Sequence, residues 1–341
     1  MPLPIVFIAV AGVTGAVGIG KTAKAIMNRK KAKKLNERAN YVIKQANRKH
    51  KRFKRNCKKN LEELGLKKAQ ILSTNIEHFI ISFGKLKNIN FQDSIGIEEI
   101  SKLCIDQKEL NDLKGMSNFA TDIITGVTGG AIGGALTAYG AYSSANWLAT
   151  ASTGTAISKL SGIAAKNATL AYFGGGALSA GGLGVSGGIM ILGGLIAGPA
   201  LAIMGWIVEA KTSKAKDEAY INMAKAEEFA TKLSVANSLC GNIIYQCQLF
   251  VDLLNRLDTY LDEFVKIMDE AIIEHNADYE NFNKQQKNAT AGAVSLAKAI
   301  KAVLDTPILT KEGNLDMKTN HILQTINPEE IKNAFEMQTE N

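Results

Sequence analysis

The clearest chemical spacing lies near the N-terminus, where Gly15 to Thr22 read Gly-Ala-Val-Gly-Ile-Gly-Lys-Thr and fit the pattern G-x-x-x-x-G-K-S/T. In a nucleotide-binding loop of this kind, backbone amides hold the phosphates, the lysine reaches the β- and γ-phosphates, and the hydroxyl holds Mg²⁺. The nucleotide candidates are therefore Gly20, Lys21 and Thr22. The residues that follow predict a long basic helix instead of the βαβ units that a nucleotide-binding domain needs. We interpret the match as coincidental and keep a P-loop NTPase as the second alternative.

The remaining chemistry-bearing side chains suggest no enzyme. No two cysteines have CxxC spacing, and the four histidines complete no metal pattern with them. We expect no catalytic residue, no metal and no cofactor, and we expect free thiols that pack as small buried hydrophobes. The cysteines are Cys57, Cys104, Cys240 and Cys247.

The middle of the chain is uncharged over an unusual length. Between Ile123 and Val208, 86 residues carry two charges, Lys159 and Lys166, and 20 of the 31 glycines. About 20 apolar residues suffice to cross a bilayer as a helix. The stretch therefore predicts a membrane hairpin with two apolar arms, Ile123–Ser158 and Asn167–Val208.

Glycines spaced by four would let the helices of this hairpin approach closely, and aromatic residues at the ends of the arms would anchor them at the membrane interface. The packing candidates are Gly126, Gly130, Gly134, Gly184, Gly188, Gly194 and Gly198. The candidate interfacial anchors are Tyr139, Tyr142, Trp147 and Trp206.

A basic segment precedes the apolar stretch. Residues 21–59 hold 17 Lys/Arg and one acid, a net charge of +16 in a chain whose total is +8. Such a segment indicates contact with a polyanion, and in a chain with a membrane hairpin we expect anionic lipid; nucleic acid is the less favoured partner. The candidate lipid-binding residues are Arg29, Lys30, Lys31, Lys33, Lys34, Arg48, Lys49, Lys51, Arg52, Lys54 and Arg55.

The most regular hydrophobic periodicity lies near the other end. Thirteen apolar residues from Phe229 to Ala271 recur in steps of three and four, which predicts a long helix from about Ser213 to Ile273 with one heptad seam. The basic N-terminal helix is its expected partner, within the chain or in an oligomer. The seam candidates are Phe229, Leu233, Phe250, Leu254, Leu257, Leu261 and Phe264.

These patterns predict an all-α fold, with a long antiparallel coiled-coil-like stalk and a glycine-zipper membrane hairpin. The expected segments are an apolar N-terminus (1–20), a basic stalk helix (21–90), a connector with a short helix (91–116), the hairpin (117–210), the heptad helix (211–275) and C-terminal helices with a turn (276–341). Positive charges follow the apolar N-terminus, which favours an inner-membrane protein or a cytoplasmic protein that associates with the membrane.

Four segments carry a resemblance: residues 151–162, 167–171, 193–200 and 297–309. They resemble a bacterial family of mostly uncharacterised glycine-rich proteins over nearly the whole chain. The plan of a hydrophobic hairpin between long helices is also similar to α-helical pore-forming cytolysins of the hemolysin E type and to apolipoprotein L. The family resemblance implies no particular activity, whereas the architectural similarity puts pore formation in play. Together with the patterns above, we expect a protein that oligomerises, inserts into a membrane and forms a pore or remodels the bilayer, as a conflict or defence effector. The alternative is a membrane-anchored scaffold that does not lyse.

Overall fold

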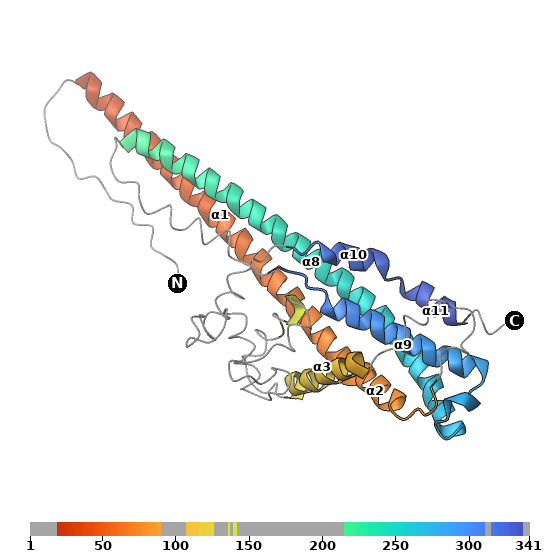
Figure 1. Cartoon of the computed structure of the whole chain (residues 1–341). Coiled ribbons are helices and arrows are strands. Elements are labelled where there is room, and N and C mark those ends of the chain that lie inside the picture. The colour runs from red at the N-terminus through yellow and green to blue at the C-terminus, as the bar shows by residue number, and fades with distance from the viewer. Residues whose placement is uncertain are drawn as a thin grey trace.

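The computed structural model describes residues 19–89, 107–125, 136, 139–141, 215–310 and 315–336. These residues form helices and connecting turns; β-structure among them is limited to two isolated bridges. The predicted all-α class is confirmed. Two helices dominate, α1 (Ile19–Ile71) and α8 (Ala215–Glu274), and we call the pair the stalk (Figure 1).

The two stalk helices run parallel. Asn36 pairs with Asn222, His50 with Asn237 and Lys67 with Asp258, so the partner's number stays 186–191 higher along the whole length. An antiparallel pair would hold the sum of the numbers constant instead. The predicted antiparallel stalk is therefore wrong. It assumed that a hairpin returns the chain directly, whereas 143 residues separate the two helices and bring the chain back to the end where it started.

The stalk is held together by the predicted seam. All thirteen seam residues of α8 are buried, each at most 4% exposed. The facing side of α1 places small and apolar residues at matching intervals, among them Ala32, Ala39, Cys57, Leu61 and Leu64. At about 25 cal/mol per Å² of apolar surface, such a continuous contact is the main stabilising term for helices of this length.

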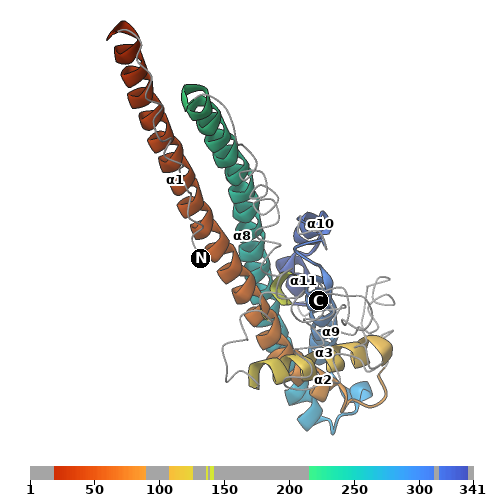
Figure 2. The same cartoon turned by 90° about the vertical axis from the view of Figure 1, so that its left-hand side faces the viewer.

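Among the described elements, the other helices gather along the far half of the stalk, and its starting end consists of α1 and α8 alone; we call this the bare end (Figures 1 and 2). A π-helical turn, η1 (Leu72–Ile76), joins α1 to α2 (Glu77–Phe83), and α3 (Gln107–Thr125) packs across this region. A short 3-10 turn, η7 (Tyr279–Asn281), reverses the chain into α9 (Lys284–Asp305), which packs on α8; α10 (Lys318–Thr325) and α11 (Pro328–Glu336) complete this head.

The start of α9 is fixed by polar contacts. Asn283 and Gln286 form a capping box, in which each side chain accepts a hydrogen bond from the other residue's backbone N–H. The Gln286 amide also donates to Glu274 at the end of α8. The box thus ties α9 back onto the stalk and lets its apolar face, which includes Val294, Leu296 and Ile300, fill the core.

Candidate polyanion-binding face

The outer face of α1 carries a row of eight exposed cations and one exposed tyrosine. Starting at Lys30, every third or fourth residue as far as Lys59 points away from the seam, and this spacing keeps them on one face of a helix. Over these positions the helix rises about 44 Å. We call this set the cationic stripe: Lys30, Lys34, Arg38, Tyr41, Lys44, Arg48, Arg52, Arg55 and Lys59, all of them exposed.

Most predicted lipid-binding residues lie on or beside this stripe. Five belong to it and five flank it in exposed positions, while Lys54 alone is half-buried and turned toward the seam. Sequence reasoning missed Arg38, Lys44 and Lys59, because it chose residues from dense charge clusters. The signal that finds them is the three-to-four spacing on the face opposite the seam. The flanking five are Arg29, Lys31, Lys33, Lys49 and Lys51.

The charge of the stripe is not neutralised by the partner helix. Residues 215–250 of α8 hold three lysines and four acids, a net charge of −1 beside the +16 of residues 21–59. Within the described part of the chain, the first ion pair of α1 is Lys58 with Glu62. Residues 251–274 hold seven acids and two cations, a net charge of −5. The stalk is therefore electrostatically polar, with its cationic half at the bare end.

The bare end also exposes apolar side chains. Met27 of α1 is 69% exposed, and Tyr220 and Ile221 near the start of α8 are each 45% exposed. Because the helices are parallel, both start at this end. The apolar sequence before α1 and the apolar sequence before α8 therefore both join the stalk here.

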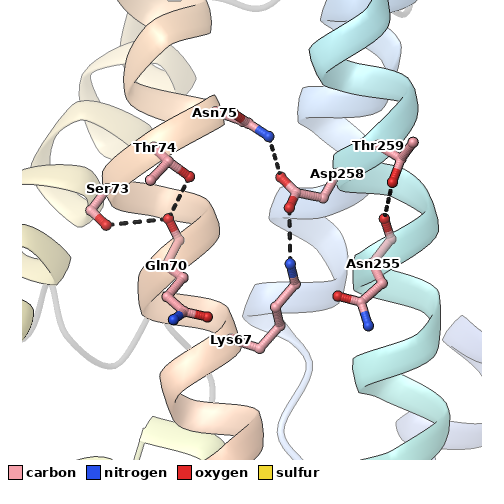
Figure 3. A network of polar contacts seen from close by, with 8 residues as sticks. All are labelled: Lys67, Gln70, Ser73, Thr74, Asn75, Asn255, Asp258 and Thr259. Atoms are coloured by element: carbon pink, nitrogen blue, oxygen red, sulfur yellow. Dashed lines mark hydrogen bonds and ion pairs between the residues drawn. The ribbon is translucent and has the colours of Figure 1, made fainter.

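Further along α1 than the stripe, one carboxylate of α8 holds the two helices together. Asp258 of α8 accepts hydrogen bonds from Lys67 Nζ at 2.9 Å and from Asn75 Nδ2 at 2.8 Å (Figure 3). These donors lie on either side of the junction between α1 and η1. The Ser73 and Thr74 hydroxyls both donate to the Gln70 carbonyl, which the π-turn leaves available (Figure 3). All groups are satisfied, so this network positions the helices.

A helical fragment of the apolar stretch packs on α1 at backbone distance. A Cβ on Gly65 would lie 2.0 Å from the Leu136 carbonyl oxygen, and one on Gly140 would lie 1.9 Å from the Leu61 carbonyl oxygen. Only glycine permits this reciprocal approach. We call the contact of Leu136 and residues 139–141 with α1 and with residues 308–309 the glycine clamp.

Tyr139 and Ala141 complete the glycine clamp. Tyr139 is 1% exposed and lies under the Lys68 ammonium, 6.0 Å from the ring centroid. The carbonyl of Ala141 accepts hydrogen bonds from the backbone N–H of Ile308 at 2.9 Å and of Leu309 at 3.0 Å. Tyr139, a predicted interfacial anchor, is thus a core residue in this structure. Tyr142, Trp147, Trp206 and the seven predicted packing glycines lie outside the described residues.

Lys68 is the most deeply buried cation in the described structure. Its side chain is 0% exposed, and burial lowers its pKa from 10.5 to about 8, against the opposing effects of Cys247 and Asp305. A buried ammonium beside an aromatic ring gains cation–π attraction but loses its hydration. Lys68 therefore connects the glycine clamp to the core at an energetic cost.

The three described cysteines are buried thiols. Cys57, Cys240 and Cys247 are free and buried in the seam, and within the described ranges no group of metal-ligating side chains occurs. Burial raises the pKa of Cys247 to about 12, which keeps it a thiol. A hydrogen bond with Cys240, together with burial, raises the pKa of Cys57. Cys104 lies outside the described residues.

The P-loop candidates lie in α1. Gly20, Lys21 and Thr22 belong to its first turn, while the earlier part of the match lies outside the described residues. No strand occurs in the part of the chain that the structure describes, so nothing there supplies the parallel sheet on which a P-loop normally rests.

The comparisons give no independent guide to function. Over the described helices, none combines the length and the hydropathy that a membrane span requires. The chain matches no protein-family model, no curated protein and no solved structure.

Proposed function

We propose that this protein docks on anionic membranes through the cationic stripe and then inserts its glycine-rich apolar stretch into the bilayer. The observation that carries the proposal is the stripe itself: eight exposed cations along about 44 Å, in the same chain as 86 residues with only two charges. A Lys or Arg near an anionic leaflet contributes about 1 kcal/mol. Eight of them along one straight face suit a flat surface.

Lipid fits the stripe better than nucleic acid does. Proteins that bind single strands interleave cations with several stacking aromatics, and the stripe has one aromatic, Tyr41, which is 63% exposed. A single exposed tyrosine among cations suits the headgroup layer, where amphipathic rings are favoured.

We further propose that the stalk is a coiled coil and that the apolar stretch inserts as a glycine-zipper hairpin, which oligomerises to form a pore or to remodel the bilayer. Since α1 covers the α8 seam within the chain, assembly would use the hairpin. Gly130→Leu with Gly194→Leu would block close helix packing there. Unchanged assembly and membrane activity in this double variant would rule out the zipper.

A bacterial inner membrane, or the cytoplasm next to it, is the proposed setting, and a conflict or defence effector the proposed role. Two alternatives have separate signatures. A scaffold that does not lyse would bind membranes without leakage. An NTPase would bind nucleotide, and the Lys21→Ala substitution would abolish that binding.

The experiment mixes the purified protein with dye-loaded vesicles of rising anionic lipid content and measures co-flotation and dye release together. Release that scales with anionic lipid supports the proposal. Flotation without release indicates the scaffold. If the protein does not float but retards nucleic acid in a gel, the stripe serves a different polyanion and the proposal is wrong.

A further inference from the structure

The glycine clamp joins the first apolar arm, which the proposed function places in a bilayer, to helix α1, which remains outside it. Residues 136–141 belong to the first apolar arm, Ile123–Ser158, which the proposed function places in a bilayer. In the structure their backbone is held against Leu61 and Gly65 of α1, and Tyr139, Gly140 and Ala141 are buried. The arm cannot keep these contacts and also lie in lipid.

The position of the clamp strengthens this conflict. Gly65 lies 38 residues along α1 from Met27 at the bare end of the stalk, roughly 55 Å away. The apolar sequence leaves the clamp after Ala141 and rejoins the stalk at the bare end, where α8 begins. The clamp therefore holds Leu136 and residues 139–141 of the first arm far from the end where exposed apolar residues gather.

The clamp also follows the cationic stripe along α1, on a side of the helix that the stripe does not occupy. The cationic stripe ends at Lys59, and the contact with the apolar fragment starts two residues later, at Leu61. Both lie on one continuous helix. A change in α1 on docking therefore reaches the glycine contact within one helical turn.

We propose that the glycine clamp is an autoinhibitory contact, which holds the first apolar arm on the stalk until docking releases it. This inference rests on the proposed function. The partner surface is built from Leu61, Gly65, Lys68, Ile308 and Leu309, and its occupants are Leu136 and residues 139–141 of the same chain.

The test opens the clamp by adding one methyl group. Gly140→Ala places a Cβ 1.9 Å from the Leu61 carbonyl oxygen, and Gly65→Ala places one 2.0 Å from the Leu136 carbonyl oxygen, each well below the 3.0 Å that real Cβ atoms keep. Gly241→Ala is the matched control, because a Cβ there has nothing within 4 Å and also lies on a stalk helix.

Two readouts separate the contact from its role. Amide hydrogen exchange at Ile308 and Leu309 reports the clamp without any membrane, since both amides donate to Ala141. Dye release from anionic vesicles reports insertion. We expect both clamp variants to exchange faster at these amides and to release dye on the order of tenfold faster, while Gly241→Ala behaves like the wild type.

The outcomes are distinguishable. Exchange unchanged in both clamp variants overturns the clamp as a contact. Faster exchange with normal flotation and unchanged release overturns its inhibitory role and leaves the docking function intact. If even the wild type neither floats nor releases dye, the proposed function fails and the inference falls with it.

Discussion

Replacing Lys68 by methionine should stabilise the protein near neutral pH, and the gain should disappear in alkali. Lys68 is 0% exposed, and its pKa is lowered from 10.5 to about 8 by burial. A difference of about 2.5 pKa units corresponds to about 3 kcal/mol, which opposes folding whenever the unfolded lysine is charged. Methionine fills a similar volume without a charge.

The direction of this pH dependence of stability follows from the number of protons that the folded and unfolded states bind. Between pH 8 and pH 10.5 the unfolded lysine holds a proton that the folded one has lost, so wild-type stability rises with pH in this window. Below pH 8 the buried lysine is charged in the folded state too, so the full cost of burying its charge opposes folding. Because Lys68 also contacts Tyr139, we expect a net gain of about 1–2 kcal/mol for Lys68→Met near pH 7. Between pH 7 and about pH 10 the free energy of unfolding of the wild type should rise by about 2–3 kcal/mol more than that of the variant, so the advantage of the variant disappears.

Urea unfolding followed by circular dichroism, at both pH values, measures this difference. Cys247, whose pKa is raised to about 12, stays a thiol in both proteins and does not distort the comparison. Lys59→Met, at an exposed position of the same helix, is the control and should change stability by less than about 0.5 kcal/mol at either pH. A stability difference between Lys68→Met and the wild type that does not depend on pH would refute the reasoning.

Two further predictions concern the packing of the helices. Gly292→Ala places a Cβ 2.6 Å from the buried Phe264 ring, so we expect a net loss of about 1 kcal/mol despite better helix propensity; a raised melting temperature would contradict this. His50→Leu leaves the buried Asn237 amide without its partner at 2.9 Å and should cost about 1–3 kcal/mol, most of which His50→Leu with Asn237→Leu should restore in a double-mutant cycle.

The sequence was sufficient to predict the long helix α8 and the face that it buries. The predicted rod from Ser213 to Ile273 agrees with α8 to within two residues at each end, since thirteen regularly spaced apolar residues leave a helix few alternatives. The seam also holds a polar pair, because His50 of α1 contacts Asn237 of α8 inside it. Periodicity of apolar residues alone cannot reveal a buried polar pair.

The relative direction of the stalk helices and the close backbone contact at Gly65 and Gly140 could not be predicted from periodicity. A heptad seam packs equally well against a parallel or an antiparallel partner, and the choice here depends on polar pairs such as Lys67 with Asp258. The glycine clamp could not be predicted from the sequence for a similar reason. Gly65 is isolated in a charged helix and Gly140 falls outside the regular glycine spacing, so only their meeting in space distinguishes them.

The most direct test of the central claim is vesicle binding by a stripe variant. Lys44, Arg48, Arg52 and Arg55, all replaced by glutamine, remove four exposed charges and about 4 kcal/mol of attraction, so the partition coefficient on anionic vesicles should fall about a thousandfold. The matched control replaces four exposed lysines outside α1 by glutamine and should bind nearly as well as the wild type: Lys85, Lys114, Lys225 and Lys318. Equal losses in both variants would contradict a docking face on α1.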